Sequence, residues 1–191
     1  MTLTTENIDN VLELCKSGNQ QAQLEIYNRY YKAMYNTSFR IVKDSYIAED
    51  IMQESFLTAF SKLSSLKINS TFSAWLKRIV INNSISYYNK HQKTINVPLD
   101  DVIYKVEDHQ GIVEDYDATS IKARSIIEML NGLKENYKMG LTLHLIEGYD
   151  YEEISEIMSI SYANCRTLIS RAKDSLRKKI STQNEFKNSA L

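Results

Sequence analysis

The sequence predicts an all-α protein in which two small helical domains are joined by an extended acidic linker. The 191-residue chain has only five Gly and one Pro, fewer turn residues than a sheet protein needs. Apolar residues recur at helical spacing in two separate blocks of the chain. Between these blocks, residues 94–118 hold the one Pro, a run of acidic residues and no sustained apolar period, which is typical of a linker.

The composition excludes several classes of protein. Hydrophobic residues make up 43% of the chain, which is enough for buried cores and argues against a disordered protein. Cys15 and Cys165 form no CxxC pair, so we expect no metal, no disulfide framework and a reducing cytoplasm. The N-terminal residues MTLTTENIDN lack a signal-peptide pattern, and no apolar run approaches the roughly 18 residues of a membrane span. We expect no membrane segment and no cofactor.

The first domain is placed at residues 1–93. A short helix containing Ile8, Val11 and Leu12 ends at the helix-breaking residues 17–19. A second helix follows, and the residues that we expect on its buried side are Leu24, Tyr27, Tyr31, Met34, Tyr35, Ile41 and Val42.

Two more helices complete the first domain. Asp44 or Ser45 can cap a third helix, in which the apolar period runs through Ile47, Ile51, Phe56 and Phe60. Residues 64–70 are expected to form a loop. Ser70 or Thr71 can cap a fourth helix, whose apolar stripe is formed by Trp75, Leu76, Ile79 and Ile85.

The second domain is placed at residues 119–182, followed by a flexible tail at 183–191. Helices are expected over residues 119–133 and 135–147, with Gly148 as a left-handed cap. Asp150 can cap the next short helix, and Glu153 can complete a capping box. A turn at 159–161 then leads into a long basic helix over residues 162–180.

One stretch of the first domain has an unusual charge. From Ser55 to Leu99 there is no acidic residue, although the chain as a whole has a net charge of −1. Lysines, an arginine and aromatic residues are interspersed in this stretch. Cations mixed with aromatic rings suit nucleic acid, including single-stranded DNA. An ordinary Lys-rich helix face over an aromatic core is the alternative.

The short helix, tight turn and longer helix near the C-terminus have the layout of a helix-turn-helix. In the longer helix one face is apolar and comprises Cys165, Ile169, Ala172 and Leu176. Near its start, Arg166, Thr167 and Ser170 are the candidates for contacts with base edges. Three further cations, Arg171, Lys173 and Arg177, are better placed for phosphates. A helical hairpin without DNA-binding function is the alternative.

Motifs in both halves resemble one family. The segment AEDIMQESF at 48–56, then Phe72, Trp75, Leu76, Arg78 and Ile79 in F-x-x-W-L-x-R-I, and then Asn82 are similar to region 2 of bacterial extracytoplasmic-function (ECF) sigma factors, members of the sigma-70 family. Residues 148–173 resemble region 4 of the same family, and the acidic segment resembles its linker. The resemblance implies a cytoplasmic transcription initiation factor without chemistry of its own.

The resemblance also implies roles for individual residues. The helix with Glu49, Asp50, Gln53 and Glu54 would bind the clamp helices of RNA polymerase, whose flap is a further expected contact. The acid-free stretch would open the −10 element. Its loop at 64–70 and Asn82 would trap a flipped base of the non-template strand. The full set of residues implied for the −10 element is Lys67, Asn69, Lys77, Arg78, Asn82 and Lys90. Trp75 is expected in the core, and the linker would thread toward the RNA path.

Region 4 departs from the family pattern at several positions. Leu133-Lys134 lacks the usual proline, Ala163-Asn164-Cys165 replaces Gly-Thr-Val, Leu168 replaces a commonly basic residue, and Ser159 replaces the Gly of the turn. We therefore hypothesise that the −35 element is read weakly and that a DNA-bound recruiting protein helps to place the factor. If Leu168 is exposed, it would be part of the docking site for that protein. An anti-sigma factor is a further candidate partner.

Two other functions compete with this one. A helix-turn-helix regulator that binds duplex DNA without polymerase would leave AEDIMQESF and the acid-free stretch unexplained. For an enzyme, the pairs His144–Glu147 and Glu152–Glu153 are the suggestive ones, and they lack an HExxH arrangement or a third ligand. We expect no enzyme, and we expect the histidines at the surface.

Overall fold

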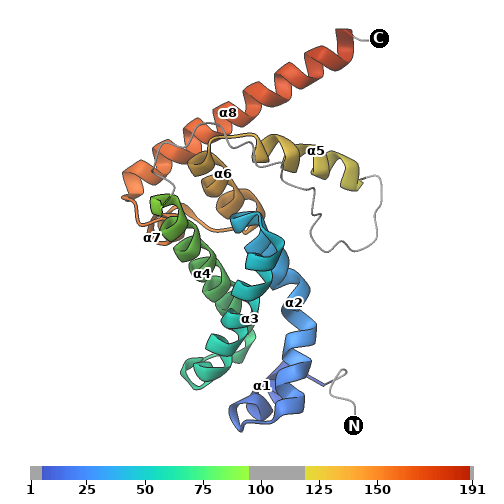
Figure 1. Ribbon diagram of the computed structural model, residues 1–191, viewed down its shortest axis with the longest axis vertical. Coiled ribbons are helices and arrows are strands. Elements are labelled where there is room, and N and C mark those ends of the chain that lie inside the picture. Colours follow the sequence, from blue (N-terminus) through green and yellow to red (C-terminus); the bar gives the residue numbers. More distant parts are fainter. Residues whose placement is uncertain (1–5, 95–118, 190–191) are drawn as a thin grey trace. The chain divides into compact units, whose positions relative to one another are not determined.

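The computed structural model describes residues 6–94 and 119–189, and every regular element in these two ranges is a helix (Figure 1). The chain divides into two compact units, residues 1–113 and 114–191. The predicted all-α fold is confirmed. Of the predicted linker at 94–118, only Thr94 lies within the described residues, as the last residue of a helix.

The first unit is a bundle around three long helices. It contains α1 (Ile8–Lys16), α2 (Gln20–Val42), α3 (Ser45–Ser61) and α4 (Phe72–Thr94). Helices α2, α3 and α4 pack against one another, and α1 packs on α2. The predicted cap of α3 is confirmed, because the Asp44 side chain accepts a hydrogen bond from the Ile47 N–H.

The core of the first unit collects the apolar residues of all four helices. Its members include Val11, Leu12, Ile26, Met34, Met52, Phe56, Phe72, Leu76 and Val80. Trp75, expected in the core, is half-buried and packs against this cluster at its edge, with its ring centroid 6.1 Å from that of Phe72. Leu24, predicted on the buried side of α2, is instead 59% exposed. It lies outside the stripe that α2 turns inward through Ala22, Ile26 and Met34.

A layer of polar groups crosses this core. Asn83 on α4 donates a hydrogen bond to Ser55 Oγ on α3 at 3.0 Å. Next to it on α4, Ser84 Oγ lies 3.1 Å from Ser38 Oγ on α2. All three serines are buried. These contacts join the three long helices by directional bonds in addition to apolar packing.

The expected loop at 64–70 has more structure than the sequence suggested. It contains two short 3₁₀ turns, η2 (Leu63–Ser65) and η3 (Asn69–Thr71), with Leu66, Lys67 and Ile68 between them. Thr71 Oγ1 and Ser65 Oγ each donate to a backbone oxygen three residues earlier, which stabilises both turns.

The second unit is built on one long helix. It contains α5 (Thr119–Asn131), α6 (Glu135–Leu141), the π-helical turn η4 (Thr142–Ile146), α7 (Tyr151–Ile157) and α8 (Tyr162–Ser189). Helices α5, α6 and α7 all pack on α8. The predicted face of α8 is confirmed, because Cys165, Ile169 and Ala172 are 0% exposed and Leu176 is 7% exposed.

Several helix ends in the second unit match their predicted signals. Gly148 has φ +81°, as a left-handed cap requires. Asp150 and Glu153 form the predicted capping box at the start of α7. Ser159 has φ +54° in the turn before α8, so a serine adopts the left-handed conformation expected of Gly there.

The structure differs from the predictions at two helix ends. The helix expected over 135–147 is α-helical only to Leu141, and its last part is the π turn η4. The helix expected to end at about 180 continues to Ser189, so it includes residues of the segment predicted as a tail. Its polar sequence lacks a stop signal such as Gly or Pro before Ser189. No helix in the described ranges combines the length and apolarity needed to cross a bilayer.

Candidate nucleic-acid interface

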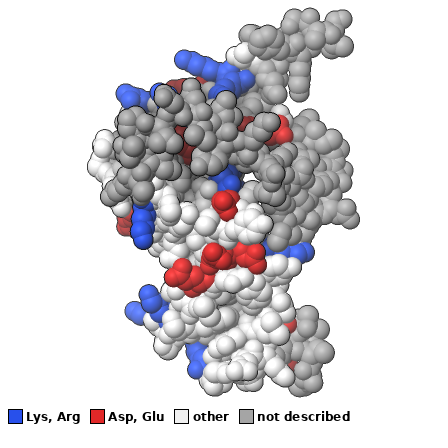
Figure 2. All heavy atoms as spheres, viewed as in Figure 1, with Lys and Arg blue, Asp and Glu red and all other residues white. Residues whose placement is uncertain are grey.

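Helix α3 presents the predicted acidic face to solvent. Glu49, Asp50, Gln53 and Glu54 are all exposed, and Gln53 Nε2 donates to Glu49 Oε1 at 3.2 Å. Figure 2 shows acidic side chains gathered on the face where α3 lies. The opposite side of α3, with Ile51, Met52 and Phe56, faces the core. The acidic surface is therefore available to a partner.

Two apolar residues flank this acidic surface, and sequence reasoning missed them. Tyr46 is 79% exposed and Leu57 is 71% exposed. Residues 46, 49, 53 and 57 fall on one helical stripe, because their spacing is three to four residues. Exposed apolar groups beside charged ones are typical of a protein-binding surface. The spacing of residues 46, 49, 53 and 57 could have placed Tyr46 and Leu57 on the acidic face. In the sequence alone, however, an apolar residue at either position fits the core equally well.

The predicted −10 residues lie on α4 and on the loop before it. Lys67, Asn82 and Lys90 are exposed, whereas Lys77 and Arg78 are half-buried. Asn82 is exposed, whereas the side chain of its neighbour Asn83 donates a hydrogen bond to Ser55 on α3. Since Arg78 and Asn82 are four residues apart on one helix, they share a face.

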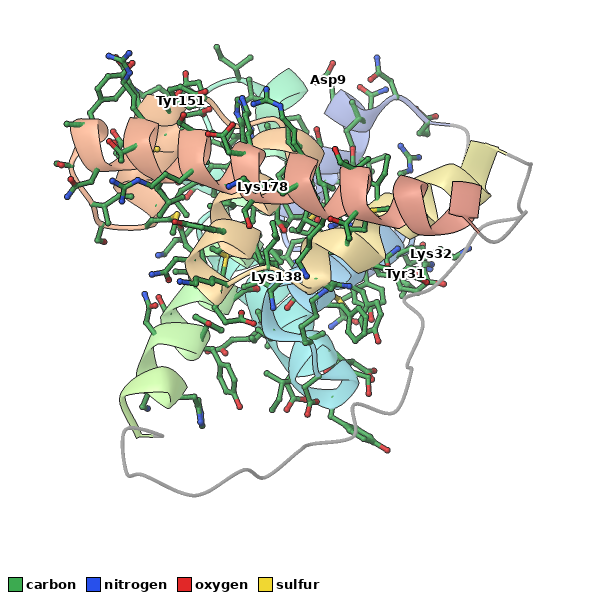
Figure 3. All side chains as sticks on the ribbon, turned by 90° about the horizontal axis from the view of Figure 1, so that it is seen from above. Asp9, Tyr31, Lys32, Lys138, Tyr151 and Lys178 are labelled. Atoms are coloured by element: carbon green, nitrogen blue, oxygen red, sulfur yellow. The ribbon has the colours of Figure 1, made fainter. Side chains whose placement is uncertain are left out.

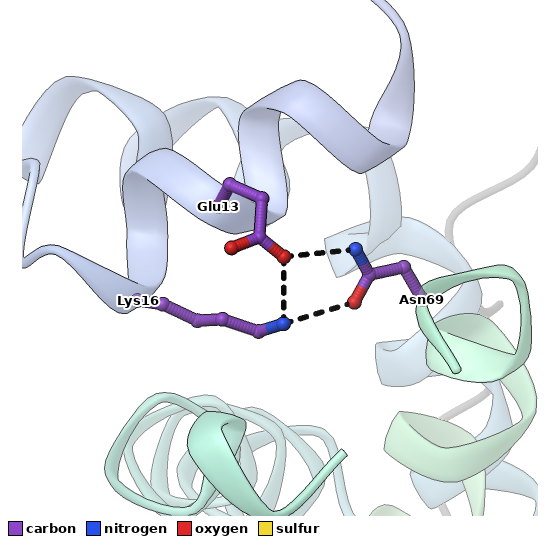
Figure 4. Close-up of polar contacts among 3 residues, drawn as sticks. All are labelled: Glu13, Lys16 and Asn69. Atoms are coloured by element: carbon purple, nitrogen blue, oxygen red, sulfur yellow. Dashed lines mark hydrogen bonds and ion pairs between the residues drawn. The ribbon is translucent and has the colours of Figure 1, made fainter. Parts of the chain in front are cut away.

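Asn69 differs from the other predicted −10 residues because its side chain is already engaged. Its Nδ2 donates to Glu13 Oε1 at 3.1 Å, and its Oδ1 accepts from Lys16 Nζ at 3.1 Å (Figure 4). Glu13 and Lys16 also form an ion pair at 2.8 Å. These interactions lower the pKa of the Glu13 carboxyl, chiefly through the hydrogen bond from Lys16. Nothing in the sequence pattern indicated that α1 contacts this loop.

The N-terminal half of α8 exposes the residues predicted to contact bases. Arg166, Thr167, Ser170 and Arg171 line one shallow open depression together with Ala163. Thr167 Oγ1 donates to Ala163 O at 3.0 Å, which holds its side chain against the helix. The Arg166 and Arg171 side chains lie on an exposed basic face that a DNA groove could receive.

The cations further along α8 have neighbours within their own unit. Arg177 pairs with Asp174 at 2.8 Å, and both side chains are well exposed, so this pair contributes little to stability. The Lys173 ammonium lies 3.1 Å from His144 Nε2 and 3.4 Å from Tyr151 Oη. Figure 3 shows Tyr151 beside the N-terminal part of α8. Lys173 is thus half-buried between two side chains, in contrast to the outward position expected of it.

His144, predicted at the surface, is half-buried. Its Nδ1 lies 3.1 Å from the Tyr149 carbonyl oxygen, which can only accept, so Nδ1 donates. Its Nε2 lies 3.1 Å from the Lys173 ammonium, which can only donate. In the described part of the chain, no three His, Cys, Asp or Glu side chains come together as metal ligands.

Leu168 does not meet the condition of exposure that its proposed role in docking requires. Its side chain is half-buried and lies against the Cα of Gly140 on α6, where a Cβ would otherwise be. A Cβ at Gly140 would also lie 3.0 Å from Ile169 Cδ1. Gly140 therefore allows α6 and α8 to approach closely, and Leu168 fills the space between them.

Comparison with known proteins identifies the family. Sigma-70 region 2 matches residues 26–94, and Sigma-70, region 4 matches residues 123–176. The ECF RNA polymerase sigma factor SigM of Bacillus subtilis (strain 168) is 31% identical over 154 residues, covering 80% of this chain and 91% of SigM. The chain belongs to the ECF RNA polymerase sigma factors. SigW of the same strain is 27% identical over 172 residues, covering 86% of this ECF sigma factor and 92% of SigW.

Solved structures share the fold of this ECF sigma factor. RpoE from Bartonella quintana, in complex with the anti-sigma factor NepR, has a TM-score of 0.56 at 20% identity, covering 82% of this chain and 95% of RpoE. CnrH, in complex with the cytosolic domain of CnrY, has a TM-score of 0.51 at 20% identity, covering 92% of this chain and 97% of CnrH.

Family membership decides between the functions considered above. The ECF sigma factor binds core RNA polymerase and promoter DNA and acts in transcription initiation. A regulator working without polymerase is not favoured, because it would leave the region 2 match at 26–94 without a role.

Proposed function

We propose that this sigma factor distributes promoter recognition over three surfaces. The acidic face of α3 (Glu49, Asp50, Gln53, Glu54, with Tyr46 and Leu57) binds the clamp helices of core polymerase. The −10 surface (Lys67, Asn69, Lys77, Arg78, Asn82, Lys90) holds the opened −10 region. The −35 surface on α8 (Arg166, Thr167, Ser170, Arg171, Lys173, Arg177) binds the −35 element.

The separation of charge in the first unit is the observation that carries this proposal. The exposed carboxylates of α3 precede a stretch, Ser55 to Leu99, that has no acid at all. A polyanion would be repelled by the first surface and attracted by the second. A surface for a basic protein partner and a surface for DNA are therefore present on neighbouring helices.

On the −35 surface we assign base contacts to Arg166, Thr167 and Ser170, since they lie near the start of α8 and are exposed. Phosphate contacts fall to Arg171, Lys173 and Arg177. The Lys173 ammonium has to leave His144 to reach DNA, whereas Arg177 gives up only an exposed pair with Asp174. Weak reading of the −35 element stays a prediction, which footprinting with polymerase alone would test.

The remaining assignments follow from the role of a sigma factor. The functional domains are residues 1–93 for polymerase and the −10 element, 94–118 for the RNA path and 119–182 for the −35 element. The protein acts in the cytoplasm, where its polymerase is, and performs no chemistry itself. An anti-sigma partner is supported by RpoE and CnrH, which share the fold and were solved with NepR and CnrY.

Charge reversal tests the polymerase surface. Glu49→Lys with Asp50→Lys should weaken binding to core polymerase by roughly tenfold or more, because both carboxylates face a basic partner. The matched control is Asp9→Lys with Glu152→Lys, which changes the net charge equally at exposed sites elsewhere. Co-purification with core polymerase gives the readout. Equal binding of both variants and the parent would refute the assignment to α3.

A further inference from the structure

Helix α1 holds the loop between α3 and α4 by polar contacts. Glu13, Lys16 and Asn69 form a closed triangle, with the three distances 2.8, 3.1 and 3.1 Å (Figure 4). Both functional groups of the Asn69 amide are used, its NH₂ by the carboxylate and its C=O by the ammonium. We call these three residues the α1 clasp.

The underside of the same loop is held by apolar packing. Leu63 and Leu66 are 1% and 8% exposed and belong to one cluster with Val11, Leu12 and Cys15 of α1. Helix α1 therefore contacts the loop twice, through its apolar face below and through the α1 clasp at the edge.

Two residues lie between these anchors and are accessible to a ligand. Lys67 and Ile68 separate the buried Leu66 from the clasped Asn69. Both are exposed, and Ile68 is 60% exposed although it is a large apolar residue. A cation and an aliphatic side chain side by side fit a phosphate and the face of an unstacked base.

We propose that the α1 clasp positions the loop so that Lys67 and Ile68, and not the Asn69 side chain, contact the base extruded from the −10 element. Glu13, Lys16 and Asn69 are then positioning residues. Glu13 and Lys16 lie before residue 26, so both are outside the segment that Sigma-70 region 2 matches, residues 26–94. This inference rests on the proposed role of the loop in −10 binding.

An exchange of the amide and the carboxylate separates positioning from base reading. Asn69→Asp alone brings two carboxylates together and should break the clasp. Adding Glu13→Gln restores it, because the Gln amide can donate to the new carboxylate while Lys16 still donates to it. The double variant keeps the net charge of the parent and changes the chemical group at position 69.

The readout is base preference at the captured −10 position. Holoenzyme reconstituted with core polymerase is bound to probes that carry each of the four bases there, in single-stranded form. We expect Asn69→Asp to reduce discrimination among the bases by about tenfold. We expect the double variant to regain the parent's preference to within about twofold. Failure of the double variant to regain it, while both variants melt at the parent's temperature, would mean that Asn69 reads the base itself.

Further variants serve as controls for the α1 clasp and for the loop. Asp9→Asn removes a carboxylate from α1 one turn before Glu13 and should leave base preference unchanged. If Asn69→Asp unfolds the protein, Lys16→Ala replaces it as the clasp-breaking variant. Lys67→Ala and Ile68→Ala should each weaken probe binding. If neither of these two does so, the loop is not the −10 contact, and the proposed function of the loop fails together with this inference.

Discussion

The loop between α3 and α4 in the first unit and helix α8 in the second are both proposed to contact DNA. The two surfaces are held in place by different kinds of contact. The loop is held by α1, with Asn69 contacting Glu13 across 56 positions of sequence. The exposed face of α8 is set by helical periodicity, because the same spacing that buries Cys165, Ile169 and Ala172 turns Arg166 and Ser170 outward. One surface therefore depends on distant contacts, and the other on local sequence.

The largest effect should come from the residue that joins the loop to its helix. Phe72 begins α4, is 1% exposed and packs against Tyr30 and Trp75. Phe72→Ala should lower the free energy of unfolding of the first unit by about 3–5 kcal/mol, because it leaves a large cavity. Denaturant unfolding followed by the fluorescence of Trp75 measures this.

Leu24→Ala is the control for that change. Leu24 is apolar but 59% exposed, so its truncation should change the free energy of unfolding by less than about 0.5 kcal/mol. A loss comparable to that of Phe72→Ala would contradict the burial described for α2 and place Leu24 in the core after all.

On α8 we expect two arginines to act differently. Arg166→Ala should reduce discrimination at one promoter position by about 1–3 kcal/mol if the side chain is bidentate to guanine. Arg171→Ala should weaken binding evenly across promoters and reduce the salt dependence by about one unit of slope. Binding measured on a promoter set at several salt concentrations distinguishes them. Equal losses on every promoter for both variants would overturn this division of roles.

The last prediction concerns the chemical reactivity of the two thiols, one in each unit. Burial raises the pKa of the Cys15 thiol to about 11 and also raises the pKa of Cys165, and both side chains are buried. The reactive thiolate forms only as pH rises through the pKa, so at pH 8 Cys15 should be alkylated roughly a hundredfold more slowly than a free thiol.

Mass spectrometry of the labelled protein reads both sites at once. Full labelling in denaturant is the positive control. Rapid labelling of Cys15 in the folded protein would show that α1 opens from its neighbours, which would weaken the case for a loop held in place by that helix.

The sequence predicted the helices and their ends well wherever the signal was local. Asp44, Asp150 and Gly148 act where capping chemistry places them, and the buried face of α8 follows from spacing alone. Leu24 was misplaced because Tyr27 and Tyr31 follow it at i+3 and i+7, which fits a helical stripe. The residues that α2 buries are instead Ala22, Ile26 and Met34.

Contacts between distant segments were not predicted. The α1 clasp joins residues that no short-range pattern relates, and its polar members look like ordinary surface residues in the sequence. The exposure of Leu168 was left open for a similar reason, since the space that its side chain fills exists because Gly140 lies opposite on α6. The half-buried position of His144 likewise involves a distant contact, because Lys173, to which its Nε2 is close, is 29 positions away.

The polar layer of Asn83–Ser55 and Ser84–Ser38 has a consequence for where α4 presents its outer residues. Apolar contacts are non-directional, so a helix held by them alone could slide along its neighbours by a turn and still bury similar area. A slip of α4 would break both contacts between helices, although Ser55 and Ser84 would keep their bonds to Ile51 O and Val80 O. The cost is about 1–3 kcal/mol for each buried group left unsatisfied. The layer therefore favours one axial position of α4 over a slipped one. It thereby fixes where along the bundle α4 presents Arg78 and Asn82, the residues proposed to contact the −10 strand.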